Sequence, residues 1–166
     1  IGNVIARRFA ALGFEVRGYA RTPRSIEGVA TFAGSDQLAA FADGLDIVVS
    51  VLPLTPETTG IMNAGFFGML ADGAFIINGG RGPQVDDDDL LAALDSGKLG
   101  GAALDVFAVE PLPQDHPFWT HPKVRVWPHV AAQTNATSAA EQVAAAITAM
   151  MDGSEPANRV DWSRGY

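Results

Sequence analysis

The chain has 166 residues and no cysteine, and 19 acidic residues against 11 Lys and Arg give it a net charge of −8. This acidity disfavours nucleic acid and anionic membrane surfaces as partners, because their phosphates would repel the chain. The lack of cysteine excludes disulfides, thiolate metal sites and cysteine nucleophiles, and no apolar run reaches the ~18 residues that span a bilayer. We expect one soluble, cytoplasmic globular domain.

Helices and strands are predicted to alternate at least four times along the chain. Apolar residues at helical spacing predict a first helix that ends at Gly13, and an alternating strand follows over 14–19. Further strands are predicted over 47–52, 74–78, 101–106 and 124–127, and further helices over 35–41, 64–70, 86–97 and 137–151. The alternation predicts an α/β fold with a doubly wound parallel sheet. The nearly continuous apolar strands 47–52 and 74–78 predict burial on both faces.

Two features near the start of the chain point to a dinucleotide site. Gly2, before the first helix, fits the last glycine of a pyrophosphate-binding fingerprint, and an ordinary glycine before a helix is the equal alternative. The strand over 14–19 leads into a turn with no carboxylate, where an NAD site would place one for the ribose hydroxyl. Arg21, Thr22 and Arg24 in that turn suit a ribose 2′-phosphate instead, or form a solvated basic loop.

Three residues beyond later strand ends could form a catalytic group, because ligands of such sheets bind at the carboxyl ends of the strands. Arg81 lies among glycines and could bind a carboxylate through two parallel hydrogen bonds. His129 and Glu110 could act as a general acid and its orienting carboxylate. Each residue alone has an ordinary structural role as its alternative. No metal site is predicted, because Asp86–Asp89 open a helix and their charge complements its dipole.

Several segments, taken in order, resemble the D-isomer-specific 2-hydroxyacid dehydrogenases. They are Asn78–Asp86, Leu90–Leu94, Gly97–Phe107, Glu110–Pro113, His116–Trp119 and Pro128–Ala131. The turn 20–22 and the closing residues 160–166 are most similar to the bacterial glyoxylate/hydroxypyruvate reductases in that family. The resemblance implies a Rossmann-type dinucleotide-binding domain over 1–135 that lacks its first strand and the N-terminal substrate domain. It also implies a C-terminal helix and tail, over 136–166, that return to the substrate domain.

The resemblance implies transfer of a hydride from NADPH to a small 2-oxo acid, such as glyoxylate or hydroxypyruvate. Arg81 would bind the substrate carboxylate, His129 would protonate the carbonyl oxygen and Glu110 would hold that histidine. Trp119 would border the substrate pocket, and Asp105 would contact the nicotinamide end of the cofactor. The full set implied to bind the cofactor is Gly2, Arg21, Thr22, Arg24, Leu52, Pro53, Leu54, Thr55, Asn78, Gly79, Gly80, Arg81, Asp105 and His129.

Two other functions remain open at this point. One is an NAD-dependent D-lactate or phosphoglycerate dehydrogenase, against which the missing carboxylate after Tyr19 argues. The other is a non-catalytic NAD(P)-binding scaffold, against which the retained Arg81, Glu110 and His129 argue. NADPH is the expected cofactor, with NAD as the alternative, and the family implies a homodimer. Because the absent first strand would be central in the sheet, we expect the 166 residues alone to be inactive and marginally stable.

Overall fold

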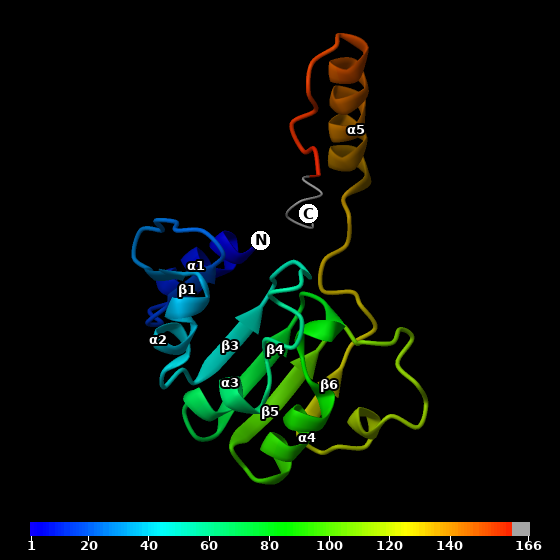
Figure 1. The fold of residues 1–166 in the computed structure, drawn as a ribbon. Coiled ribbons are helices and arrows are strands. Elements are labelled where there is room, and N and C mark those ends of the chain that lie inside the picture. The colour runs from blue at the N-terminus through cyan, green and yellow to red at the C-terminus, as the bar shows by residue number, and fades with distance from the viewer. Residues whose placement is uncertain (161–166) are drawn as a thin grey trace.

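The computed structural model describes residues 1–160, which contain two parallel sheets and flanking helices (Figure 1). The elements in chain order are α1 (Gly2–Ala11), β1 (Arg17–Ala20), β2 (Ala30–Ala33), the 3-10 turn η1 (Ser35–Gln37), α2 (Leu38–Ala42), β3 (Ile47–Ser50), α3 (Ala64–Met69), β4 (Ala74–Asn78), η2 (Gly82–Gln84), α4 (Asp87–Asp95), β5 (Leu99–Leu104), η3 (Pro117–Trp119), β6 (Val124–Val126) and α5 (Ala136–Met151). The predicted alternation of helix and strand is confirmed, and β4 has the predicted bounds. The closing residues 161–166, which carry part of the family resemblance, lie outside the described residues.

The strands form one sheet of two and one of four. β1 pairs with β2, and β3, β4, β5 and β6 pair in that order, with every pairing parallel. Parallel pairing brings the carboxyl ends of β3 to β6 to one edge of the larger sheet, where a ligand site is expected. The chain folds as the predicted α/β architecture of the Rossmann type.

The main core lies between one face of the four-stranded sheet and helices α3 and α4. Ile76 of β4 is fully buried there and packs in one cluster with Phe67 and Leu90. On the opposite face, Phe75 is 51% exposed and Ile77 is 37% exposed. The prediction that the strand over 74–78 is buried on both faces is therefore wrong for this chain, because α3 and α4 pack on the face that carries Ile76 and leave Phe75 and Ile77 partly exposed on the other.

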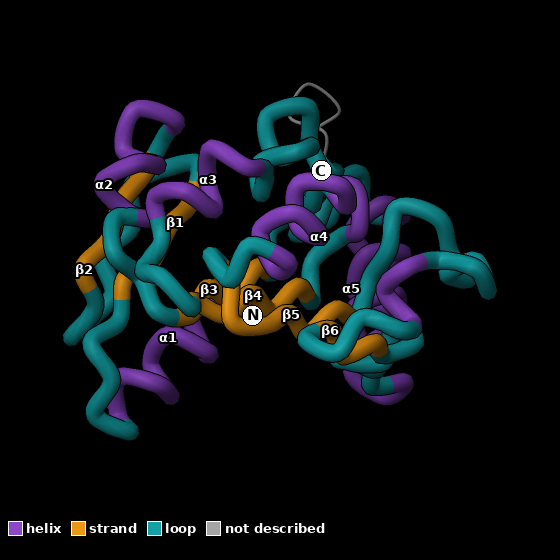
Figure 2. Tube along the Cα trace, turned by 90° about the horizontal axis from the view of Figure 1, so that it is seen from below, coloured by secondary structure: helices purple, strands orange, loops and turns teal. Residues whose placement is uncertain are grey.

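Helices lie on both sides of the strands, with α3 and α4 on one side and α1 on the other (Figure 2). The prediction that the acidic run opens a helix is confirmed, because the Asp86 carboxylate caps α4 by accepting from the Asp89 N–H at 3.0 Å. Asp89 in turn accepts from the Ala64 N–H at 2.8 Å, which ties α4 to the start of α3. These caps fix the two helices that cover the core.

Helix α5 projects away from the four-stranded sheet (Figure 1). It begins after the cap residue Asn135, and none of its residues is buried. Its apolar residues Val143 and Ile147 are 58% and 53% exposed. Over residues 1–160, no helix combines the length and the hydropathy that crossing a membrane requires. The division of the chain at residues 135 and 136 stays a prediction.

Candidate active site

The residues predicted to carry the chemistry follow the ends of neighbouring strands in the four-stranded sheet. Arg81 comes after β4, Asp105 directly follows β5 and His129 comes after β6. Since β4, β5 and β6 are parallel neighbours, all three residues lie along the same edge. Glu110 enters this edge from the loop that connects β5 to β6.

Glu110 and His129 form the closest polar contact of this group. The Glu110 Oε2 lies 2.8 Å from the His129 Nδ1, and the other carboxylate oxygen accepts from the Phe107 N–H at 2.9 Å. The hydrogen bond from His129, followed by that from the Phe107 N–H, holds the pKa of Glu110 below its usual value, and the Arg81 charge acts in the same direction. An ionised Glu110 only accepts hydrogen bonds, so Nδ1 carries a hydrogen and Nε2 is the nitrogen left for a ligand.

The main chain around His129 is held by a buried carboxylate. His129 has a φ of 57°, in the left-handed region that non-glycine residues rarely occupy. Asp105 accepts from the N–H groups of Val130 and Ala131, at 2.8 and 2.9 Å, and so fixes the chain just beyond the histidine. Glu110 and Asp105 therefore hold His129 from its side chain and from its backbone. The contact of Asp105 with nicotinamide stays a prediction.

Arg81 lies in a tight turn between β4 and η2. Its guanidinium donates to the Gly80 carbonyl at 2.7 Å, and its backbone N–H donates to the Gln84 side chain at 3.1 Å. Gly82 brings this turn against the next loop, because a Cβ there would lie 1.8 Å from the Phe107 carbonyl carbon. The structure thus brings the Arg81 turn together with the segment that leads to Glu110.

Asn78 at the end of β4 shapes the same turn. Its Oδ1 accepts from the Gly80 N–H at 3.0 Å, and its Nδ2 donates to the Arg81 carbonyl at 3.1 Å. Asn78 is 1% exposed, so its amide makes its hydrogen bonds to protein groups and not to solvent. A Cβ on Gly79 would meet only ordinary contacts, at 3.9 Å or more. The cofactor contacts of Asn78, Gly79 and Gly80 stay predictions.

The loop after β3 contains the residues predicted for the adenosine side of the cofactor, Leu52 to Thr55. Thr58 fixes this loop, since its hydroxyl donates to the Pro53 carbonyl at 2.8 Å and accepts from the Thr55 N–H at 2.8 Å. The loop also lies near the start of α1, because a Cβ on Gly2 would lie 3.4 Å from Val51. The structure therefore places the N-terminus of α1 beside the end of β3.

Arg21, Thr22 and Arg24 lie in the exposed turn that follows β1. A residue that the sequence did not single out, Glu57, lies close enough to this turn to feel the charge of Arg21. The pKa of Glu57 is lowered first by a hydrogen bond with Thr55 and last by the charge of Arg21. The charge of Arg21 therefore acts on the loop after β3. The two parts of the predicted cofactor site, the turn after β1 and the loop after β3, are close to each other.

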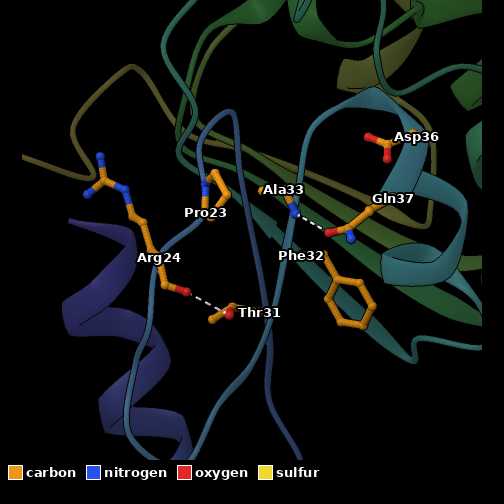
Figure 3. Close-up of a pocket in the computed structure, with 7 residues that line it drawn as sticks. All are labelled: Pro23, Arg24, Thr31, Phe32, Ala33, Asp36 and Gln37. Atoms are coloured by element: carbon orange, nitrogen blue, oxygen red, sulfur yellow. Dashed lines mark hydrogen bonds between the residues drawn. The ribbon is translucent and has the colours of Figure 1, made fainter.

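A cavity of about 430 Å³ lies beside β2 and η1 (Figure 3). Its lining comprises Pro23, Arg24, Thr31, Phe32, Ala33, Asp36 and Gln37. The Arg24 guanidinium points away from Thr31, whose hydroxyl donates to the Arg24 carbonyl at 2.7 Å. Of the predicted site residues this cavity shares only Arg24, so it is separate from the Arg81, Glu110 and His129 group. Residues 1–160 hold no cluster of three or more His, Asp or Glu that could bind a metal ion.

Trp119 is a site residue that the structure does not tie to the catalytic group. It ends η3, it is 53% exposed, and its indole N–H donates to the Pro113 carbonyl at 2.8 Å within the same loop. Its place beside the substrate stays a prediction. Gln84, in contrast, contacts the Arg81 turn, although the sequence did not indicate it as a site residue. The local sequence around a glutamine that follows Gly-Pro does not show which groups its amide binds.

Comparisons with known proteins agree on one family. The family model described as "D-isomer specific 2-hydroxyacid dehydrogenase, NAD binding domain" matches residues 1–131. A glyoxylate/hydroxypyruvate reductase A from Serratia proteamaculans is 49% identical over all 166 residues, which span 53% of that relative. The chain thus spans about half the length of this curated relative.

Solved structures show the same similarity in three dimensions. A D-isomer specific 2-hydroxyacid dehydrogenase from Xanthobacter autotrophicus Py2, in complex with NADPH and MES, matches with a TM-score of 0.94 and 47% identity, over 97% of this chain and 66% of that one. An NADPH-dependent glyoxylate/hydroxypyruvate reductase from Sinorhizobium meliloti, in complex with NADP and sulfate, matches with a TM-score of 0.93 and 42% identity, over 99% and 54%. The chain belongs to the D-isomer specific 2-hydroxyacid dehydrogenase family, within which it matches the NAD-binding domain.

Proposed function

We propose that the protein reduces small 2-oxo acids to 2-hydroxy acids with NADPH, with glyoxylate and hydroxypyruvate as the expected substrates. The observation that carries the proposal is the 2.8 Å contact between Glu110 and His129 beside the Arg81 turn. To reduce a 2-oxo acid, the protein must bind the substrate carboxylate and give a proton to the carbonyl oxygen. Arg81 suits the first task and His129 suits the second. The names of the matched reductases support the same reaction.

The donors at the end of β1 fit NADPH better than NADH. Arg21, Thr22 and Arg24 offer positive charge and a hydroxyl, and the turn itself contains no carboxylate to meet a ribose hydroxyl. Gly2 lies at the start of α1, close to Val51 just after β3, and a pyrophosphate would bind at this helix N-terminus. Leu52 to Thr55, Asn78 to Gly80 and Asp105 complete the proposed cofactor contacts. When bound, NADPH supplies the hydride.

Three residues perform the remaining steps. Arg81 binds the substrate carboxylate through its planar fork of donors. His129 gives the proton on Nε2 to the carbonyl oxygen as the carbonyl carbon is reduced, so the substrate gains one hydride and one proton. Glu110 stays ionised throughout and stabilises the charged imidazole before transfer. Trp119 is proposed to border the substrate from the loop between β5 and β6.

The organisation of the whole protein is proposed on the same basis. Residues 1–135 form the dinucleotide-binding domain, and residues 136–166 return to a substrate domain. The exposed apolar residues of α5, with none buried in this structure, support its packing against a further part of the protein. We propose a homodimer, as the family resemblance implies, in the cytoplasm.

Kinetics of the full-length protein separate this function from its rivals. We expect NADPH oxidation that depends on glyoxylate, and a fall in turnover of about 10²–10⁴-fold in His129→Gln with NADPH affinity retained. Turnover per folded site that is unchanged in His129→Gln would remove His129 from the mechanism. A scaffold would bind NADPH without glyoxylate-dependent turnover.

Replacement of both Arg21 and Arg24 by alanine tests the cofactor preference. The affinity for NADPH should fall while that for NADH changes little, because only NADPH carries the 2′-phosphate. The exposed Arg7 on α1 serves as the control, and Arg7→Ala should leave both affinities unchanged. A higher specificity constant for NADH in the unaltered protein would contradict the NADPH preference and favour the NAD-dependent dehydrogenases.

A further inference from the structure

A buried glutamine, Gln84, lies between the loops that the proposed function assigns to the cofactor and to the substrate. It is the last residue of η2, three positions after Arg81, and its exposure is 0%. A fully buried amide is stable only when its polar atoms are hydrogen-bonded. The partners of this amide therefore show what it holds in place.

Every polar atom of the Gln84 side chain has a partner. Its Nε2 donates to the carbonyl oxygens of Leu52 and Pro53, both at 3.0 Å. Its Oε1 accepts from the Arg81 N–H at 3.1 Å and from the Ser50 hydroxyl at 3.4 Å. One planar amide thus joins the loop after β3 to the backbone of the residue proposed to bind the substrate carboxylate.

The amide has little freedom to move independently of these partners. A Cβ on Gly80 would lie 2.5 Å from the Gln84 Oε1 and 3.0 Å from the Leu52 carbonyl oxygen. The Gln84 main chain is anchored separately, because its carbonyl accepts from the Met62 N–H at 2.9 Å. A substitution of the side chain therefore removes the links between the loops while η2 keeps its anchor.

We propose that Gln84 is a positioning residue that couples occupancy of the cofactor loop, Leu52 to Thr55, to the orientation of Arg81. The inference rests on the proposed roles of those two segments. A cofactor that contacts the loop fixes the two carbonyls that Nε2 binds, and the rigid amide transmits this order to the Arg81 N–H. Coupling between two binding sites is reciprocal, so a carboxylate on Arg81 also tightens cofactor binding.

Two variants separate the halves of this link. Gln84→Glu keeps an oxygen that can accept from the Arg81 N–H, but it loses both donated bonds, and its charge repels the carbonyls of Leu52 and Pro53. Gln84→Met has a similar length and loses all of the bonds. Gln114→Glu makes the same chemical change at an exposed position of the segment between β5 and β6 and is the matched control. Measurements at about pH 8 favour the ionised form of the buried glutamate, whose pKa burial raises.

The experiment measures hydrogen exchange at the Arg81 amide and the affinity for oxamate, a 2-oxo acid analogue, each with and without NADP in the full-length protein. In the unaltered protein NADP should slow the exchange and tighten oxamate binding by about tenfold, within the usual range of site–site coupling. Without NADP, the Arg81 amide of Gln84→Glu should exchange as slowly as in the unaltered protein. On addition of NADP, neither the exchange nor the affinity for oxamate should change in this variant. Gln84→Met should exchange quickly in both conditions, and the control should behave as the unaltered protein.

Steady-state kinetics give an independent readout. The KM for glyoxylate should rise about tenfold in both Gln84 variants while kcat stays within about threefold, because the defect lies in how Arg81 is held. Coupling that survives in both variants, or Arg81 exchange that ignores NADP in the unaltered protein, overturns the inference. Gln84→Met decides the matter if Gln84→Glu fails to fold. If the unaltered protein reduces no 2-oxo acid, the proposed function fails, and the exchange measurements with NADP alone still decide the role of Gln84.

Discussion

Gly82 offers a direct test of how the Arg81 turn packs against the loop that leads to Glu110. A Cβ there would lie 1.8 Å from the Phe107 carbonyl carbon and 2.3 Å from the Ala108 nitrogen, whereas ordinary contacts begin at 3.4 Å. To raise the 1.8 Å distance to 3.4 Å, Gly82→Ala must move the two backbones apart by about 1.6 Å. Backbone atoms cannot rotate away as a side chain does, so we expect a destabilisation of about 1–3 kcal/mol or more.

The displacement should also reduce activity. The Phe107 N–H donates to Glu110 at 2.9 Å, so a shift of that segment moves the carboxylate that holds His129. A misplacement of about 1 Å in an active site can cost about 10²-fold in rate, and we expect a loss of at least that size in kcat. Thermal unfolding and glyoxylate reduction by the full-length variant measure both effects.

A second glycine variant provides the control. Gly68→Ala adds a Cβ on α3 where no atom lies within 4 Å. It should keep full activity and equal or higher stability, because alanine favours a helix by up to about 1 kcal/mol over glycine. A Gly82→Ala protein that melts and turns over like the unaltered one would refute the packing argument.

Three further predictions concern charge. Arg81→Lys keeps the positive charge and loses the planar fork, so the KM for the 2-oxo acid should rise more than kcat falls; an unchanged KM would argue against a carboxylate at Arg81. His129→Ala removes the main cause of the lowered pKa of Glu110, so a carboxyl NMR titration should find that pKa higher than in the unaltered protein, yet still below its usual value, because the Phe107 N–H remains. A lowered carboxyl pKa stabilises the folded protein above the unfolded pKa of about 4.3, and this stability is lost as pH falls through the folded pKa. The melting temperatures of the unaltered protein and Glu110→Gln should therefore differ most near neutral pH and converge in acid. The difference should be small, because the Glu110 side chain is 37% exposed.

Local patterns located most of the elements, because helix and strand periods, caps and turn glycines act over a few neighbouring residues. β4 spans the predicted residues 74–78, and the Asp86 cap begins α4 where the acidic run indicated. β2 was missed, because Ala30–Ala33 has no alternating pattern. That segment is a strand because it pairs with β1, whose Tyr19 lies opposite Phe32. Pairing between two separate segments does not change the pattern of apolar and polar residues within either one.

Burial of the strands shows the same limit. The apolar run over 74–78 is compatible with cover on one face or on two, because periodicity describes a strand's own faces and not what packs against them. In the structure Ile76 is buried and Phe75 is half-exposed. The position of α3 and α4 decides this difference, and it depends on contacts between segments far apart in the chain.

The candidate site divides along the same line. Residue types and their places after predicted strands were enough to select Arg81, Glu110 and His129, since each carries its chemistry in its own side chain. The sequence did not indicate that Gln84 binds both Arg81 and the loop after β3, or that Asp105 accepts from two N–H groups beyond His129. A candidate catalytic side chain can be proposed from its type and its neighbours in sequence. The residue that holds it in place is identified only by distances between loops, which the packing of four parallel strands sets.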